Sequence, residues 1–136
     1  MNSFNKSVLR VNKFFKKLEN INSNKIIVHT DKINALVQSN LSDKRFNKIS
    51  NIDGHLFVVK PNIRVSSFPY TGGIKEFENS ISLTDDPLIT NIKNNGGIIV
   101  GSTNMDEAAF GGDTSSSFYG RCINPINKKL SVGGSS

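Results

Sequence analysis

Residues 96–107 read Gly96-Gly97-Ile98-Ile99-Val100-Gly101-Ser102-Thr103-Asn104-Met105-Asp106-Glu107, and this stretch decides the fold class. Ile98-Ile99-Val100 is a short β-branched run, which predicts a buried strand. The two glycines before it end any preceding helix. Thr103 stands where a helix N-cap is expected, with Asp106 and Glu107 in the first turn. The stretch therefore predicts a strand, a polar turn and the start of a helix.

A second strand and a helix lie upstream of this stretch. His55-Leu56-Phe57-Val58-Val59-Lys60 is an apolar run between Gly54 and Pro61, which predicts a buried strand over 55–60. Acidic residues and Pro87 then begin a predicted helix over 86–95. Strand, helix and strand in this order form a βαβ unit, so we expect an α/β fold with a mixed or partly parallel sheet flanked by helices.

The first part of the chain carries the positive charge. Residues 1–50 hold ten basic and three acidic side chains, whereas residues 51–136 hold seven and eight, so the net charge of +6 belongs to the N-terminal third. Within residues 4–18, apolar side chains recur at helical spacing and basic ones occupy the opposite face, which predicts a basic amphipathic helix. The apolar set is Phe4, Val8, Val11, Phe15 and Leu18. Two interpretations stand: a transit segment, which favours the mitochondrial matrix over the cytoplasm, or a first helix packed on the domain.

Weaker patterns connect this helix to the strand at 55–60. Residues 20–32 are mostly polar and are predicted to be a connector. Residues 33–37 are too few for periodicity to separate a strand from a helix. Residues 38–53 are predicted to be linker with room for a short helix. We therefore expect a basic helical segment and linker over 1–53, followed by an incomplete α/β core over 54–136.

Composition excludes several classes of protein. A chain of 136 residues forms one domain of ordinary size at most. The single cysteine, Cys122, rules out an intramolecular disulfide. No apolar run approaches the roughly 20 residues of a membrane span. His29 has no second ligand at a metal-binding spacing, so no metal site is expected.

Five motifs carry a resemblance over residues 33–136. They are Ile33-Asn34-Ala35-Leu36-Val37, Gly54 with Lys60 six residues later, the run Gly101–Glu107, Asn124-Pro125, and Val132-Gly133-Gly134-Ser135-Ser136. In this order and spacing the sequence resembles the amidase-signature enzymes. The Thr-Asn-Met-Asp-Glu run favours the branch formed by the A subunits of glutamyl-tRNA(Gln) amidotransferase.

The resemblance implies a Ser-cisSer-Lys triad. By position, Lys60 matches the family's general base and Ser135 its bridging serine in a cis peptide. A neutral lysine would take a proton, through the bridging hydroxyl, from a nucleophilic serine that attacks the amide carbon of glutamine. Phe110, Gly111 and Gly112 match a stretch that lines the family's substrate pocket. On local sequence alone, a lysine emerging into solvent at the end of a strand is the more common reading of Lys60.

The sequence departs from the family pattern at two places. Pro61 stands where the family usually has an aspartate, which removes a carboxylate near the base and a backbone donor. The nucleophilic serine belongs to a second Gly-Gly-Ser that the family carries beyond the position of Ser136. The chain is therefore expected to be a truncated part of the fold and inactive by itself.

The resemblance also implies partners. Enzymes of this branch release ammonia from glutamine, and a B subunit uses it to amidate Glu-tRNA(Gln), together with a small accessory subunit. ATP and Mg are used by the partner subunit, and no cofactor is expected in this chain. The alternatives are a truncated non-catalytic remnant and a fragment of a general amidase. Direct nucleic-acid binding is disfavoured, because the basic face of the first helix lacks exposed aromatics.

Overall fold

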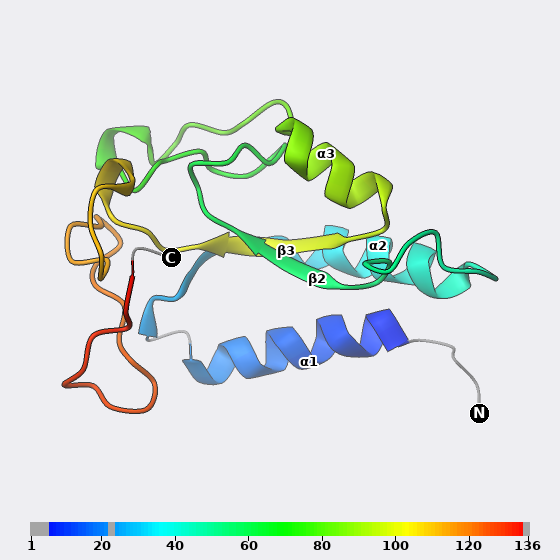
Figure 1. The fold of residues 1–136 in the computed structure, drawn as a ribbon, viewed down its shortest axis with the longest axis horizontal. Helices are drawn as coiled ribbons and strands as arrows, with labels where there is room; N and C mark the ends of the chain where they lie inside the picture. The colour runs from blue at the N-terminus through cyan, green and yellow to red at the C-terminus, as the bar shows by residue number, and fades with distance from the viewer. Residues whose placement is uncertain (1–5, 22–23, 135–136) are drawn as a thin grey trace.

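The computed structural model describes residues 6–21 and 24–134 (Figure 1). The elements in chain order are α1 (Lys6–Ile21), β1 (Ile27–Thr30), α2 (Lys32–Lys44), β2 (Leu56–Val59), the 3₁₀ turn η2 (Lys75–Phe77), α3 (Pro87–Asn94), β3 (Ile98–Thr103) and the 3₁₀ turn η3 (Glu107–Ala109). Within the described residues the strands form one sheet in the order β1-β3-β2. β2 runs parallel to β3 and β1 runs antiparallel, so the predicted mixed α/β sheet is confirmed.

The predicted βαβ unit is present as β2, α3 and β3. Pro87 occupies the first turn of α3, where its missing N–H costs nothing. The helix ends at Asn94 with Asn95 as its C-cap, and Gly96 follows with a φ of +81°, a conformation that glycine adopts without strain. Gly97 is packed so closely against Ile92 and Phe57 that a side chain there would collide with both. The glycine pair therefore both ends α3 and lets it pack on the sheet.

Helices cover both faces of the sheet. Figure 1 shows α1 on one side of β3 and α3 on the other. Alternation along β3 explains this arrangement, since successive side chains point to opposite faces of a strand. One core cluster consists of Val11, Phe15, Ala35, Ile98 and Val100, from α1, α2 and β3. The other consists of Val59, Val65, Phe68, Ile89 and Ile99, on the side of α3.

The amphipathic N-terminal helix is confirmed as α1, which buries Val11 and Phe15. Its first described turn is capped from α2, because the Asp43 carboxylate accepts hydrogen bonds from the backbone N–H groups of Ser7 and Val8 at 2.9–3.1 Å. A carboxylate at a helix N-terminus satisfies unpaired N–H groups and complements the helix dipole. Phe4 lies outside the described residues.

The structure corrects the predicted connector over residues 20–32 and resolves the open assignment of residues 33–53. The predicted connector contains β1, whose residues pair with Gly101, Ser102 and Thr103 of β3. The ambiguous segment and the first part of the predicted linker form a single helix, α2, which begins at the N-cap Asp31. The sequence concealed this helix because it buries the small residues Ala35 and Ser39 and exposes larger apolar ones.

The predicted helix after Thr103 is also wrong. Thr103 is the last residue of β3 and pairs with Ile27 instead of capping a helix. In the described residues after Thr103 the one helical element is the 3₁₀ turn η3, and Asp106 makes no side-chain capping bond to it. The ladder with β1 continues to Thr103, which explains why the strand is longer than its β-branched run. None of the helices in the described part of the chain has the length and apolar character needed to cross a membrane.

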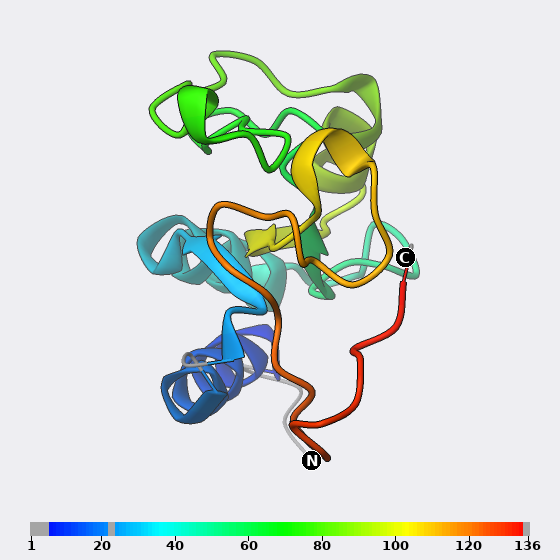
Figure 2. The ribbon, with the colours of Figure 1, turned by 90° about the vertical axis from the view of Figure 1, so that its left-hand side faces the viewer.

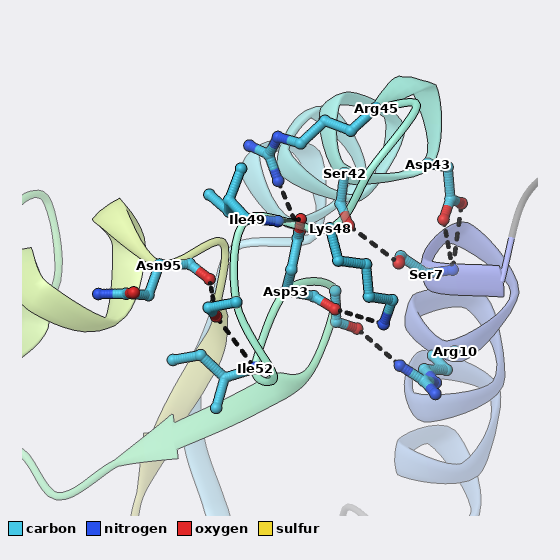
Figure 3. Close-up of polar contacts among 12 residues, drawn as sticks. Ser7, Arg10, Ser42, Asp43, Arg45, Lys48, Ile49, Ile52, Asp53 and Asn95 are labelled. Carbon is cyan, nitrogen blue, oxygen red and sulfur yellow. Dashed lines mark hydrogen bonds and ion pairs between the residues drawn. The ribbon is translucent and has the colours of Figure 1, made fainter.

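A buried carboxylate ties the start of β2 to the end of α2 (Figure 3). Asp53 is fully buried and accepts hydrogen bonds from Ser42 Oγ, the Arg45 guanidinium and the Ile49 N–H. Burial by itself raises the pKa of Asp53, but these hydrogen bonds and the Arg45 charge outweigh it, so the pKa lies below its ordinary value. Arg10 of α1 donates to the neighbouring Gly54 carbonyl at 3.1 Å, which connects the first helix to the same corner.

Candidate functional site

A cavity of about 440 Å³ lies at the ends of the two parallel strands. Lys60 follows β2 directly, and Asn104 to Asp106 follow β3, so both segments reach the same edge of the sheet. The carboxyl ends of parallel strands are the usual position of a site in α/β folds. Figures 1 and 2 show that residues 107–134, in yellow-orange to red, loop at this end of the sheet. Gly111, Gly112, Gly133 and Gly134 of these loops also line the cavity.

Lys60 is held at the cavity by a fixed turn. Its carbonyl accepts a hydrogen bond from the Ile63 N–H at 3.0 Å, and the carbonyl of Pro61 accepts one from the Gly72 N–H at 3.0 Å. Pro61 itself is fully buried. The proline that stands in place of the family's aspartate therefore packs in the interior and stiffens the strand end, so the Lys60 side chain leaves a rigid backbone.

The structure brings several predicted site residues together. Lys60, Gly111 and Gly112 line one cavity. Phe110 is 91% exposed and does not line it. Ser135 lies outside the described residues, although Gly134 immediately before it lines the cavity. The roles assigned to these residues remain predictions.

Asp106 is a site residue that the sequence did not reveal. It is 7% exposed, and its Oδ2 accepts hydrogen bonds from the N–H groups of Asp113 and Thr114 at 3.1 and 2.8 Å. Its Oδ1 accepts from the N–H and the Oγ of Ser116 at 3.1 and 2.9 Å. Burial by itself raises the pKa of Asp106, but the donors from Thr114, Ser116 and Asp113 outweigh it and lower the pKa.

Asn104 is a second residue beside the cavity that the sequence did not reveal. It connects the end of β3 to the segment before β1 and to the loop at 117–120. Its Nδ2 donates to the carbonyls of Lys25 and Gly120 at 3.0 and 2.8 Å, and its Oδ1 accepts from Ser117 Oγ at 2.6 Å. Lys25 precedes β1 in the chain, whereas Ser117 and Gly120 lie in the loop after β3. The only signal in the sequence was the Thr-Asn-Met-Asp-Glu run, whose polar residues also fit a helix start.

No metal centre is found in the described part of the chain, where no three metal-binding side chains cluster. His29 packs edge-on against Phe68, with ring centroids 4.6 Å apart. Burial lowers the pKa of His29, and the Asp31 charge opposes that shift only in part. The imidazole is not among the residues that line the Lys60 cavity.

The two buried carboxylates make stability sensitive to acid. The pKa values of Asp53 and Asp106 are lowered in the folded state. As the pH approaches the unfolded-state carboxylate pKa of about 3.9, the unfolded chain therefore binds more protons than the folded chain does. This stabilisation is present above about pH 4 and is lost as the pH falls through the folded-state values. Urea unfolding from about pH 6 to pH 3 is expected to show a falling midpoint below about pH 4. In Asp106→Asn the urea midpoint should fall less steeply with decreasing pH than in the wild type. An equally steep fall in both proteins would contradict this account.

Comparison with known families places this fold and cavity. The model of the Amidase family matches residues 10–136. A curated relative from Methanocaldococcus jannaschii, named as the A subunit of glutamyl-tRNA(Gln) amidotransferase, is 36% identical over 132 residues, covering 95% of this chain. A relative of the same name from Fusobacterium nucleatum is 34% identical over 130 residues, covering 93% of this chain and 27% of its own length. The chain belongs to the amidase family.

Solved structures agree with the fold. The A subunit of glutamyl-tRNA(Gln) amidotransferase from Thermotoga maritima matches with a TM-score of 0.72 at 21% identity, covering 93% of this chain and 26% of that one. A chain from a vestigial protein complex, described with the origins of an s-triazine catabolic enzyme, matches with a TM-score of 0.85 at 19% identity. The match covers 95% of this chain and 29% of that one. This chain spans 30% of the length of the M. jannaschii relative.

Proposed function

We propose that this chain provides the lysine half of a glutamine amidohydrolase centre, as part of the A subunit of a glutamyl-tRNA(Gln) amidotransferase. The observation that carries the proposal is the meeting of Lys60 with Gly133 and Gly134 at one cavity. The 36% identity to a relative of that name supports the choice of substrate. The cavity, at about 440 Å³, has the volume of a small-molecule site.

In the proposed mechanism Lys60 is the general base and Ser135 relays the proton. A neutral amine accepts a proton through the Ser135 hydroxyl, and the nucleophilic serine attacks the carboxamide carbon of glutamine. Lys60 returns this proton through Ser135 to the amide nitrogen, the C–N bond breaks, and ammonia leaves an acyl-enzyme. Water then hydrolyses the ester, which releases glutamate and restores the proton of the nucleophilic serine. Among residues 1–136 we assign no nucleophile, so the rest of the family's fold must supply it. The 136-residue chain alone is proposed to be inactive.

The partners follow from the same proposal. A B subunit with a small accessory subunit would accept the ammonia, bind Glu-tRNA(Gln) and use ATP and Mg, so the chain itself needs no cofactor. The basic face of α1 agrees with a mitochondrial matrix location, which is also part of the proposal. The apolar side chains exposed on α2, Ile33 at 80% and Val37 at 51%, favour a chain that works within a larger body.

The test is ammonia release from L-glutamine. The chain alone is expected to give none, and turnover should appear when it is combined with the remaining C-terminal part of the M. jannaschii relative. Lys60→Met should lower that turnover by about 10³-fold or more, because a triad member is lost. Turnover by the chain alone, or unchanged turnover in Lys60→Met, would overturn the proposal.

A substrate panel separates the proposal from a general amidase. L-Glutamine is expected to be hydrolysed in preference to propionamide and benzamide, which lack its charged groups. Preferential hydrolysis of either simple amide would assign the centre to a general amidase. A soluble complex without hydrolysis of any amide would instead support a non-catalytic remnant.

A further inference from the structure

The loop anchored by Asp106 contacts Gly134 beside the cavity that Lys60 lines. We infer that Asp106 is a positioning residue: its carboxylate fixes the turn at 111–116, and that turn sets the position of Gly134. The inference concerns how Gly134 is placed at the cavity that Lys60 lines, and it rests on the function proposed above for that cavity. Asp106 itself performs no proton transfer in this scheme.

The first step is the anchoring of the turn. The four hydrogen bonds to the Asp106 carboxylate come from Asp113, Thr114 and Ser116, all within one short turn. A buried carboxylate with several donors forms charge-assisted hydrogen bonds, which are roughly twice as strong as neutral ones. An asparagine would present an N–H group toward one pair of these donors. Only an ionised carboxylate can accept all four of these hydrogen bonds at this position.

The backbone around the anchor adopts conformations that need external support. Ala108, Ala109 and Thr114 have φ values of 52°, 62° and 62°, which non-glycine residues rarely adopt. A residue in this conformation persists only where its surroundings impose it. Asp106 supplies part of that constraint at both ends of the loop, because its carbonyl accepts from the Ala109 N–H at 3.0 Å and its carboxylate accepts from the Thr114 N–H.

The second step is the contact between the turn and Gly134. A side chain at Gly134 would overlap the carbonyl oxygen of Gly112, so the two backbones are in direct contact. Gly111, next to Gly112, lies against the Asp106 carboxylate so closely that a Cβ there would overlap it. A displacement of the carboxylate is thus transmitted through Gly111 and Gly112 to Gly134. Lys60 lies on the same cavity from the other strand.

The test uses backbone NMR of the 136-residue chain. Asp106→Asn is expected to shift the amide resonances of Gly112 and Gly134, and to increase the rate of Cys122 alkylation about ten-fold by local opening. Cys122 reports on this loop because its N–H donates to Thr114 Oγ1 at 2.7 Å. The control is Asp53→Asn, which removes another buried carboxylate, in the segment before β2. It should lower the unfolding midpoint without moving Gly134.

A pair of glycine variants tests the contact without removing the carboxylate. Gly111→Ala must displace Asp106 and is expected to reproduce the shifts of Asp106→Asn, whereas Gly112→Ala meets open space and should leave Gly134 in place. Neither glycine has a positive φ, so only the space around them differs. If Asp106→Asn fails to fold, Gly111→Ala alone decides the question. Unchanged Gly134 resonances in a folded Asp106→Asn or Gly111→Ala chain would overturn the inference.

An L-glutamine titration separates the inference from the proposed function. Perturbation of the Gly134 and Lys60 resonances by glutamine in the wild type, with at least five-fold weaker binding in Asp106→Asn, would support both. If glutamine leaves the wild-type resonances unchanged, the result counts against the proposed function. The positioning role is then still decided by whether Asp106→Asn shifts the Gly134 resonance. Equal glutamine affinity in the two proteins, with Gly134 unmoved, would overturn positioning alone.

Discussion

Replacing Asp53 with alanine is expected to lower the free energy of unfolding by about 3 kcal/mol, the cost of breaking a buried charge pair. The variant leaves the Ser42 hydroxyl, the Arg45 guanidinium and the Ile49 N–H without their shared acceptor (Figure 3). Because the Asp53 side chain is fully buried, bulk water does not reach its place to accept these hydrogen bonds. Urea denaturation near neutral pH measures the loss as a change in midpoint at constant slope.

The matched control for Asp53 is Asp86→Ala. Asp86 also pairs with an arginine, Arg64, but that pair lies at the surface, with the arginine side chain half exposed. Exposed pairs contribute little to stability because water and salt screen them. We expect only a small midpoint change for Asp86→Ala, and an Asp53→Ala chain as stable as this control would contradict the assigned role.

Gly101→Val is expected to destabilise the chain by about 3 kcal/mol, at the upper end of the cost of overpacking a core. Gly101 pairs with Thr30 of β1 and with Val58 of β2 at the centre of the sheet. A Cβ at Gly101 would lie 2.5 Å from the carbonyl oxygen of His29. Because that neighbour is backbone, relief requires β1 to move away from β3. Thermal unfolding and amide exchange of residues 27–30 measure the two effects.

Gly112→Ala is the control for this variant, since a Cβ there has no neighbour within 4 Å. It should unfold as the wild type does. If Gly101→Val retains wild-type stability and amide protection in β1, then residues 27–30 are not an integral strand of the sheet. The experiment therefore tests the largest correction that the structure makes to the sequence-based description.

Asp53→Ala and Gly101→Val both disturb the structure that positions Lys60 at the cavity. Asp53 fixes the chain at the entrance to β2, and β2 ends one residue before Lys60. Gly101 sits on β3, opposite Val58 of β2. The lysine is thus placed by two buried features that contain none of the residues proposed for the chemistry. A variant of either one is expected to act on Lys60 through β2 and to leave the loop held by Asp106 in place.

Motifs within continuous runs of sequence were predictable. The βαβ unit followed from Leu56–Val59, Pro87 and Ile98–Val100, because apolar β-branched runs favour strands and a proline fits a helix start. The predicted burial holds for Ile98–Val100 of β3, whereas β2 lies at the sheet edge and Val58 is 43% exposed. The helix α1 followed from its spacing. The assignment of Lys60 to a catalytic site came from the family motifs and stays a prediction; the structure shows that Lys60 lines a cavity.

Elements that depend on distant partners were not predictable. β1 is four residues long and becomes a strand only because β3 offers its edge. The buried face of α2 consists of alanine and serine, so a search for the periodic spacing of large apolar residues does not detect this helix. Thr103 and Asp106 resemble a helix start locally, but the ladder with β1 and the donors from Asp113 to Ser116 engage them instead.

The sequence by itself determined the α/β class, the family and the end of β2 as the place of the lysine, because these rest on local propensity and on motifs of fixed spacing. The tertiary structure alone decided which residues surround that lysine. Asp106 and Gly134 are 28 positions apart in the sequence, yet they are linked through Gly111 and Gly112 by contacts that no spacing encodes. Hydrogen bonds to a buried carboxylate and close backbone packing are long-range effects, so they appear only once the chain is folded.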